Sequence, residues 1–373
     1  MAKVRPIALY LPQFHPIPEN DLWWGKGFTE WTNVVKARPL FEGHYQPQLP
    51  ADLGFYDLRL PDTMLQQANL ARKYGIEGFC FYHYWFNGKK LLQRPVDDML
   101  SSGKPDFPFM LCWANENWTR KWDGRDEEVL MVQSHSADDD INHIHHLIKF
   151  FKDPRYIRVD NKPVFVIYKS FLLPDPAATA KKWREIAAQY GMELYLCHMV
   201  FRYNKSYIDL SDGFDAAIDF EPFGTRRQES TLTPTKTKVN SRSPIVKKIF
   251  GKLNKATIEE ARINRLNIKE YRHMFENLKP LNEFGYKIFP SLVPGWDNTA
   301  RKSNSPVLIL NNSTPYLFKE WVEKILRDFK PYSAQESFLF INAWNEWAEG
   351  NHLEPCSRWG LQYLEAFKSV LEK

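Results

Sequence analysis

Residues 338–350 read Phe-Leu-Phe-Ile-Asn-Ala-Trp-Asn-Glu-Trp-Ala-Glu-Gly, and this stretch decides the fold. The apolar run 338–343 is long enough for one strand that is buried on both faces. Two carboxylates, Glu346 and Glu349, follow it three residues apart beside Trp344 and Trp347. Paired carboxylates are the groups that cleave the acetal bond between sugars. The two glutamates could instead flank a surface turn, but a turn would not account for the two tryptophans.

Apolar runs of this kind recur along the chain, with amphipathic segments between most of them. Strands are expected at 7–10, 78–82, 109–113, 164–168, 194–197, 216–219, 287–289 and 338–343. Helices are expected at 61–74, 95–101, 138–151, 177–190, 268–278, 316–329 and 361–371. Strands that are apolar on both faces fit a parallel sheet covered on both sides. The pattern predicts an α/β fold, a (β/α)8 TIM barrel. A doubly wound sheet is the alternative, but no glycine-rich GxGxxG loop occurs.

Side chains suited to sugar binding gather where the predicted strands end. The carboxyl ends of barrel strands build the active site. Aromatic rings can stack on the apolar face of a sugar, while amide and carboxylate groups bind its hydroxyls. The candidate substrate-binding residues at these ends are Tyr10, His83, Tyr84, Trp113, Asn115, Glu116, Trp118, Tyr168, Trp296, Asn345, Trp347 and Glu354. The catalytic candidates are Glu346 and Glu349.

Some of these residues also have a purely structural interpretation. Glu354 could be a hydrogen-bond acceptor at the barrel rim, and His83 could be a satisfied core histidine. Glu116 would be a reserve acid or base if the pair Glu346 and Glu349 did not act as one.

His143, His145 and His146 resemble a metal cluster next to the acidic run 138–140. Both groups lie in one amphipathic segment, and acidic residues are ordinary at the start of a helix. We therefore predict no metal and no cofactor.

Charge is distributed unevenly over the 373 residues, which carry a net charge of +5. Segment 225–256 holds nine basic residues and one acidic residue, so the remainder is mildly acidic. We predict a single catalytic domain over 1–373 with a basic, flexible insertion at 225–256, after the sixth strand. This distribution does not suggest nucleic-acid binding. The insertion could contact a lipid-linked glycan or an anionic membrane surface.

The four cysteines show no CxxC spacing, which argues against a zinc site or a disulfide framework. No signal-peptide pattern and no long apolar run is present. We predict a cytoplasmic protein, either free or peripheral to the inner membrane.

Several segments resemble proteins of the WbsX type, which occur in bacterial polysaccharide and O-antigen gene clusters and carry the name glycosyltransferase. The matching segments are 81–89, 112–119, 162–168 and 342–355. The resemblance extends from Tyr10 to Tyr363. The chain is also similar to the endo-α-mannosidases of glycoside hydrolase family 99, mainly around the last strand.

The resemblance to these families implies a (β/α)8 barrel and a division of labour between the two glutamates. Glu346 would help the 2-hydroxyl of the sugar to attack C1, forming a 1,2-anhydro sugar. Glu349 would be the general acid and then the base that activates water, with retention of configuration. The mannosidases usually carry a histidine where this chain has Ala348.

The expected function is that of a retaining glycoside hydrolase or transglycosylase, acting on a bacterial polysaccharide or O-antigen-type glycan and linked to lipopolysaccharide biosynthesis. The alternatives are a glycosyltransferase and a non-catalytic glycan-binding barrel.

Overall fold

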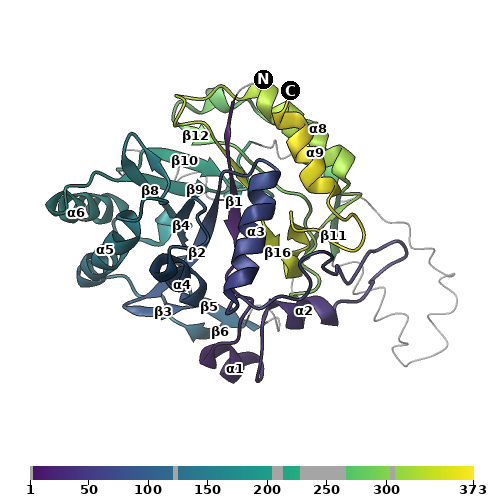
Figure 1. Cartoon of the computed structure of the whole chain (residues 1–373), viewed down its shortest axis with the longest axis horizontal. Coiled ribbons are helices and arrows are strands. Elements are labelled where there is room, and N and C mark those ends of the chain that lie inside the picture. The colour runs from purple at the N-terminus through teal and green to yellow at the C-terminus, as the bar shows by residue number, and fades with distance from the viewer. Residues whose placement is uncertain (1–2, 121–124, 204–212, 227–265, 303–306) are drawn as a thin grey trace, which may run out of the picture.

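The computed structural model describes residues 3–120, 125–203, 213–226, 266–302 and 307–373. The centre of the molecule is a sheet of parallel strands that forms a nearly closed barrel (Figure 1). Hydrogen-bonded neighbours follow the order β12-β10-β9-β8-β4-β2-β1-β15-β13. The bounds are β1 Arg5–Tyr10, β2 Gly78–Phe86, β4 Phe109–Trp113, β8 Lys162–Ile167, β9 Tyr195–Val200, β10 Ala216–Asp219, β12 Ile288–Phe289, β13 Ser291–Leu292 and β15 Phe338–Ile341. The predicted α/β barrel is confirmed.

The seventh strand of the barrel is broken at Pro290, which alone separates β12 from β13. On one side, Phe289 of β12 pairs with Ile218 of β10. On the other side, Leu292 of β13 pairs with Ile341 of β15. Proline has no N–H to donate to a sheet, which accounts for the interruption. The two pieces therefore act as one strand that joins the ends of the sheet, and the predicted strand 287–289 is its first half.

Helices cover the outside of the barrel, and α1, α2 and the hairpin of β5 and β6 lie toward the end to which β1 runs (Figure 1). The helix bounds are α1 Pro18–Trp24, α2 Glu30–Lys36, α3 Pro61–Lys73, α4 Arg94–Ser102, α5 Ala137–Phe151, α6 Pro176–Gln189, α8 Pro315–Asp328 and α9 Gln362–Leu371. Proline near the start of α3, α6 and α8 suits the first turn, where a missing N–H costs nothing. The amphipathic prediction for α5 is confirmed, since Ile144 and Leu147 on its inner face are fully buried.

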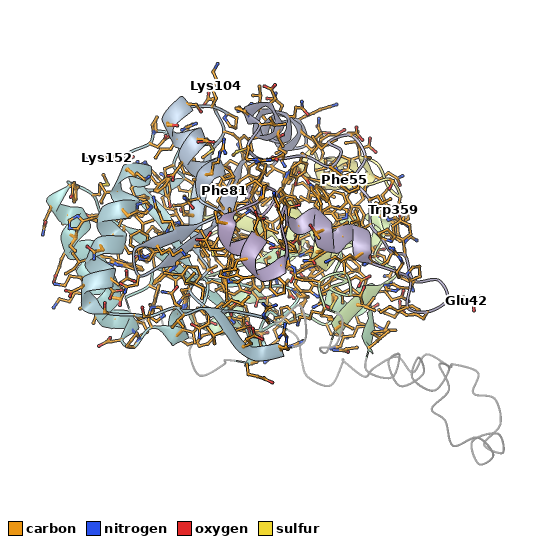
Figure 2. All side chains as sticks on the ribbon, turned by 90° about the horizontal axis from the view of Figure 1, so that it is seen from below. Glu42, Phe55, Phe81, Lys104, Lys152 and Trp359 are labelled. Atoms are coloured by element: carbon orange, nitrogen blue, oxygen red, sulfur yellow. The ribbon has the colours of Figure 1, made fainter. Side chains whose placement is uncertain are left out.

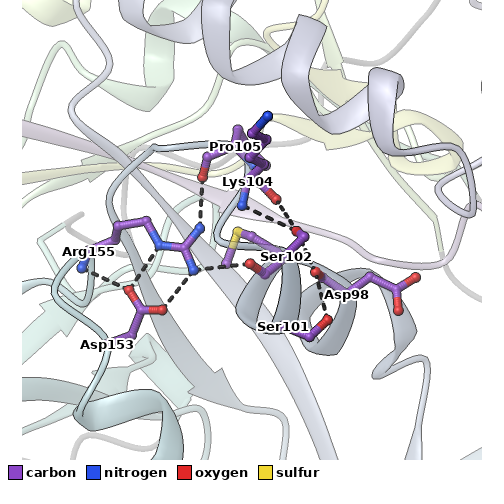
Figure 3. A network of polar contacts seen from close by, with 8 residues as sticks. Asp98, Ser101, Ser102, Lys104, Pro105, Asp153 and Arg155 are labelled. Carbon is purple, nitrogen blue, oxygen red and sulfur yellow. Dashed lines mark hydrogen bonds and ion pairs between the residues drawn. The ribbon is translucent and has the colours of Figure 1, made fainter.

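Arg155 ties together the loops that enter β4 and β8, at the end of the barrel where these strands begin (Figure 3). Its guanidinium donates to both carboxylate oxygens of Asp153, at 2.9 and 2.7 Å. It also donates to the backbone carbonyls of Pro105 and Met99, at 2.9 and 3.0 Å. Within the preceding turn, the Ser102 hydroxyl donates to the carbonyl of Asp98 at 2.7 Å. These bonds stabilise the end of the barrel opposite to the strand ends that carry the predicted site.

The chain also forms short strands outside the main barrel strands. Their bounds are β3 Lys89–Leu91, β5 Trp118–Arg120, β6 Arg125–Met131, β7 Arg158–Val159, β11 Leu266–Glu270, β14 Val307–Asn311, β16 Asn345–Glu346 and β17 Asn351–His352. The 3-10 turns are η2 Ser170–Leu172, η7 Tyr271–Met274, η8 Leu281–Phe284 and η9 Trp347–Glu349.

The helix predicted at 268–278 is wrong, because this part of the chain forms β11 and the short turn η7 instead. Leu266 and Ile268 alternate with polar residues, which is the period of a strand rather than of a helix. The apolar run of β14 supplies a parallel partner for β11. A tertiary contact with a distant segment therefore determines the local structure here.

The hydrophobic core runs from β1 to α9 and includes all four cysteines, which are free and buried as small apolar side chains. In the described part of the chain, no helix is long and apolar enough to cross a membrane. Of the predicted basic insertion 225–256, only Thr225 and Arg226 are among the described residues.

Candidate active site

A cavity of about 380 Å³ opens at the carboxyl ends of the barrel strands. Of the predicted site residues, those that line it are Tyr84, Glu116, Trp118, Tyr168, Trp296, Glu346 and Glu349. They come from β2, from the segments that follow β4, β8 and β13, and from the hairpin after β15. The structure thus brings together both catalytic candidates and five of the twelve substrate-binding candidates.

Two asparagine side chains hold together, through hydrogen bonds, the strand ends that surround the cavity. The Asn345 side chain accepts from the backbone N–H of Leu11 at 2.8 Å and donates to its carbonyl at 3.0 Å. Asn115 makes the same pair of bonds with Lys169, both at 2.8 Å. In each case the asparagine at the end of one strand holds the backbone just after the neighbouring strand. Both residues are fully buried and act in positioning rather than in substrate contact.

Glu346 and Glu349 reach the cavity from one turn. Glu346 ends β16, and Glu349 ends the 3-10 turn η9. Gly350 follows with a φ of 58°, in the left-handed region, and a Cβ there would meet Gln48 Nε2 at 2.7 Å. Only glycine fits this position without strain, which explains the glycine at the end of the motif.

Arg301 joins three carboxylates at the base of the cavity. Its Nη1 donates to Glu349 at 2.7 Å, and its Nη2 donates to Glu346 at 2.7 Å and to Glu30 at 2.6 Å. The guanidinium side chain is 13% exposed. The planar fork of arginine suits such multiple binding of carboxylates. Arg301 therefore fixes the relative positions of the two catalytic candidates.

Glu30, from the start of α2, lies behind this pair and has no exposed surface. Besides Arg301, it accepts from the backbone N–H of Ala348 at 3.1 Å and from the Gln13 amide at 3.3 Å. It thus links the turn that carries the catalytic candidates to α2 and to the segment after β1.

Burial and mutual repulsion favour the protonated forms of the catalytic candidates. Burial, together with the charges of Glu349 and Glu30, raises the pKa of Glu346 to about 8 against the lowering effect of Arg301. Burial also raises the pKa of Glu349, with Glu30 adding to the effect. Burial alone would lower the pKa of Arg301, but the three carboxylates raise it, so this residue stays charged. A pair that shares one proton supplies an acid and a base at the same pH.

The opposite wall of the cavity is aromatic with one ion pair. Lys169 and Glu116 pair with each other there. The Trp118 ring packs edge-on against Tyr84 at 5.0 Å. Burial raises the pKa of the Tyr84 hydroxyl well above its ordinary value, so it remains a hydrogen-bond donor.

Seven of the predicted substrate-binding residues do not line the cavity, namely Tyr10, His83, Trp113, Asn115, Asn345, Trp347 and Glu354. Glu354 lies in a buried network in which its carboxylate accepts from Gln67 at 2.6 Å, Trp347 at 2.7 Å and Tyr56 at 2.9 Å. Tyr10 donates to the same Gln67 at 2.6 Å. The structural interpretation of Glu354 therefore agrees with its position.

His83 and Trp113 point away from the cavity toward α5. Nε2 of His83 lies 3.0 Å from Nε2 of His143, and the indole N–H of Trp113 donates to the carbonyl of Trp85 at 3.1 Å. Successive side chains of a strand face opposite sides, so the neighbours Tyr82 and Tyr84 line the cavity while His83 does not. The described residues contain no group of three or more side chains placed to hold a metal ion.

The predicted set of site residues left out several residues that build the cavity, and the main ones are Gln13, Trp24, Glu30, Tyr82, Lys169, Arg301 and Lys302. Most come from loops far from the glutamate motif along the chain. For Tyr82 a signal existed, since strand alternation places it on the same face as Tyr84.

The cavity at the carboxyl ends of the barrel strands thus combines a pair of glutamates with an aromatic wall. The chain matches the family model described as glycosyltransferase WbsX over residues 6–367, and it belongs to this family. The resemblance to the WbsX type is thereby confirmed.

Two similar relatives, each named uncharacterized protein WxcX, come from two strains of Xanthomonas campestris pv. campestris. Each is 42% identical over 371 residues, which cover 98% of this chain and 49% of the relative. The chain thus spans about half the length of these curated relatives.

Among solved structures, a glycoside hydrolase-like protein superposes with a TM-score of 0.60 and 15% identity, covering 100% of this chain and 94% of that chain. The endo-α-mannosidase of glycoside hydrolase family 99 from Bacteroides thetaiotaomicron, in complex with bis-tris-propane, superposes with a TM-score of 0.57 and 15% identity. That match covers 99% of this chain and 96% of the mannosidase. These similarities establish a shared fold.

Proposed function

We propose that the protein is a retaining glycoside hydrolase or transglycosylase that acts on a bacterial polysaccharide or O-antigen-type glycan, with Glu346 and Glu349 as its catalytic residues. The observation that carries this proposal is the Arg301 cluster. It holds both carboxyl groups at 2.7 Å from one guanidinium, beside a cavity walled by aromatic rings. The fold shared with a family 99 endo-α-mannosidase supports it.

In the proposed first step, the carboxylate of Glu346 accepts the proton of the sugar 2-hydroxyl while that oxygen attacks C1. The bond from C1 to the leaving oxygen breaks, and Glu349 donates a proton to this oxygen. In the second step, the Glu349 carboxylate accepts a proton from water, or from the hydroxyl of an acceptor sugar, as its oxygen attacks C1. The three-membered ring opens, and O2 regains a proton from Glu346. Two inversions at C1 give net retention.

This scheme needs one charged and one protonated carboxyl group in the resting site. Three carboxylates share one guanidinium, and burial penalises the excess negative charge. The cluster therefore favours retention of one proton by the catalytic pair, as the raised pKa values of both members indicate. In such a pair the proton belongs to both residues together.

The decisive test is Glu349→Gln, assayed with the surface polysaccharide of the producing organism. Loss of a general acid is expected to slow turnover about a hundredfold or more. Glu323→Gln is the matched control, because Glu323 pairs with Lys373 on the surface of α8. If the folded Glu349→Gln protein turned over substrate as fast as the wild type, Glu349 would not be the general acid.

A second measurement separates the roles of the two glutamates. A substrate with a fluoride leaving group needs no proton from the enzyme in the first step, so a rapid burst of fluoride release is expected from Glu349→Gln and not from Glu346→Gln. The reverse pattern would exchange the two roles.

The second candidate is a glycosyltransferase, favoured by the description of the family. It predicts tight binding of a nucleotide sugar, which calorimetry with the common donors would detect. Polysaccharide binding that survives both glutamine substitutions, without turnover of any substrate by the wild type, would instead favour a non-catalytic glycan-binding barrel.

We also infer the surroundings in which this activity operates. The basic segment 225–256 would bring the protein to a lipid-linked glycan or to the anionic cytoplasmic surface of the inner membrane. Flotation with vesicles of anionic and of neutral lipid, with and without this segment, tests the idea. Equal behaviour in both lipids would contradict it.

A further inference from the structure

A second cavity lies behind the wall of the candidate active site. Its volume is about 140 Å³, roughly that of five water molecules and enough for one sugar ring. Trp296 lines both cavities. The turn after β16 also divides them, since Glu349 faces the first cavity and Gly350 the second.

Charge in this second cavity comes from Asp297 and Arg358, the only Asp, Glu, Lys or Arg side chains among its described lining. Asp297 is buried, and one of its carboxylate oxygens lies 2.7 Å from both His44 Nε2 and Gln46 Nε2. Its other oxygen accepts from the hydroxyl of Thr299 at 2.6 Å. The negative group is therefore satisfied by the protein itself.

Arg358 differs from Asp297, because its guanidinium makes no hydrogen bond or ion pair within the described parts of the chain. Its guanidinium lies over the ring of Tyr45 at 4.6 Å and near the ring of Trp359 at 5.0 Å. Contacts of this kind engage the face of the guanidinium and leave the N–H donors at its edge available. The Arg358 side chain is exposed to solvent. Figure 2 shows its neighbour Trp359 on the side of the molecule where the loop with Glu42 projects.

Uncharged donors complete the second cavity. Gln48 bonds to His352 through its Oε1 at 2.8 Å, which leaves its amide N–H₂ as a donor. Thr314 lines the cavity at the start of α8, where the positive end of the helix dipole lies. Asn312 is held by Glu270 at 2.8 Å and presents a fixed amide. The cavity thus combines aromatic rings and amides with one uncompensated positive charge.

We propose that this second cavity binds an acidic sugar unit, with Arg358 as the partner of its carboxylate or phosphate group. The proposal rests on the proposed function in that the ligand is part of a glycan. A planar guanidinium binds a carboxylate or phosphate through two parallel N–H donors. A neutral sugar could use the rings and amides but would form no ion pair with Arg358. A glycan chain that carries acidic units would then be held at a site next to the one where it is cleaved.

Calorimetry with the full chain carrying Glu349→Gln tests this proposal, because that background prevents turnover of the ligand. The probes are an oligogalacturonate, a sugar phosphate and a neutral oligosaccharide of matched length. We expect the acidic probes to bind, and the comparison between them identifies which anion the cavity prefers. Adding Arg358→Gln should weaken their binding at least about tenfold, as for a lost hydrogen bond to a charged group. Arg327→Gln, at an exposed arginine of α8, is the matched control and should change nothing.

Equal binding of the neutral and acidic probes would overturn the proposal, as would acidic binding that Arg358→Gln leaves unchanged. Binding of a nucleotide sugar through Arg358, with none of the acidic oligosaccharide, would overturn it as well. In the otherwise unchanged enzyme, Arg358→Gln should raise KM for an acidic polymer much more than KM for a short neutral substrate. Because calorimetry compares the binding of the probes with and without Arg358→Gln, a failure of this proposal is distinguishable from a failure of the catalytic assignment of Glu349.

Discussion

Replacing Glu30 with glutamine should shift the pH profile of activity toward acid. Glu30 Oε1 and Glu346 Oε2 both accept from Nη2 of Arg301, at 2.6 and 2.7 Å. Two charges in this arrangement are about 5 Å apart and repel each other by about 3 kcal/mol at an effective dielectric constant of about 20. That energy corresponds to about two pKa units. Burial is the main cause of the raised pKa of Glu346, and the charge of Glu30 is a further cause that this substitution removes.

Both members of the catalytic pair should respond in the same direction, since Glu30 also raises the pKa of Glu349. The acid limb of kcat/KM reports ionisation of the base, and the alkaline limb reports loss of the proton from the acid. In Glu30→Gln both limbs should move to lower pH, with the larger shift for Glu346. The assay is the pH dependence of kcat/KM for wild type, Glu30→Gln and the surface control Glu323→Gln. A profile that falls in height without moving, or that moves toward alkali, would refute the electrostatic coupling.

Two further predictions concern stability. Burial lowers the pKa of His83 from 6.5 to about 3, so between these values the unfolded chain binds more protons and stability is lost as the pH falls. From pH 6.5 to about pH 5 this loss is about 2 kcal/mol, so the difference in unfolding free energy between wild type and His83→Gln should shift by that amount in urea titrations. A constant difference would contradict it. Arg155→Ala should lower the unfolding free energy by about 2 kcal/mol, because it removes the hydrogen bonds to the half-buried Asp153 and to two backbone carbonyls, while kcat/KM of the folded protein stays unchanged. A fall in kcat/KM at full folding would show that the two ends of the barrel are coupled.

The barrel could be predicted because each of its strands is a short apolar run bounded by polar or turn residues. Where a run was broken or weak, the prediction failed. Pro290 divides the seventh strand, and the predicted helix at 268–278 is instead β11, paired with β14. No pattern within residues 268–278 reveals that partner, which lies about forty residues further along the chain.

The proposed catalytic pair could be predicted because Glu346 and Glu349 lie in one short motif. Their partners Glu30 and Arg301 were not, since they meet across 271 positions of sequence. The second difficulty was to predict the face of the strand to which each side chain points. His83 and Trp113 sit at strand ends as expected, yet their side chains face α5, and an even spacing from Tyr84 would have selected Tyr82 instead.

The paired asparagines bear on how this scaffold could be redesigned. In both Asn115-Glu116 and Asn345-Glu346, the asparagine fastens the backbone, and the next residue points into the cavity. One residue of each pair thus positions the backbone, and the residue after it contributes a side chain to the cavity. Position 116 can therefore be varied in a library while Asn115 preserves the strand end, which makes it a natural starting point for changing the selectivity of the enzyme.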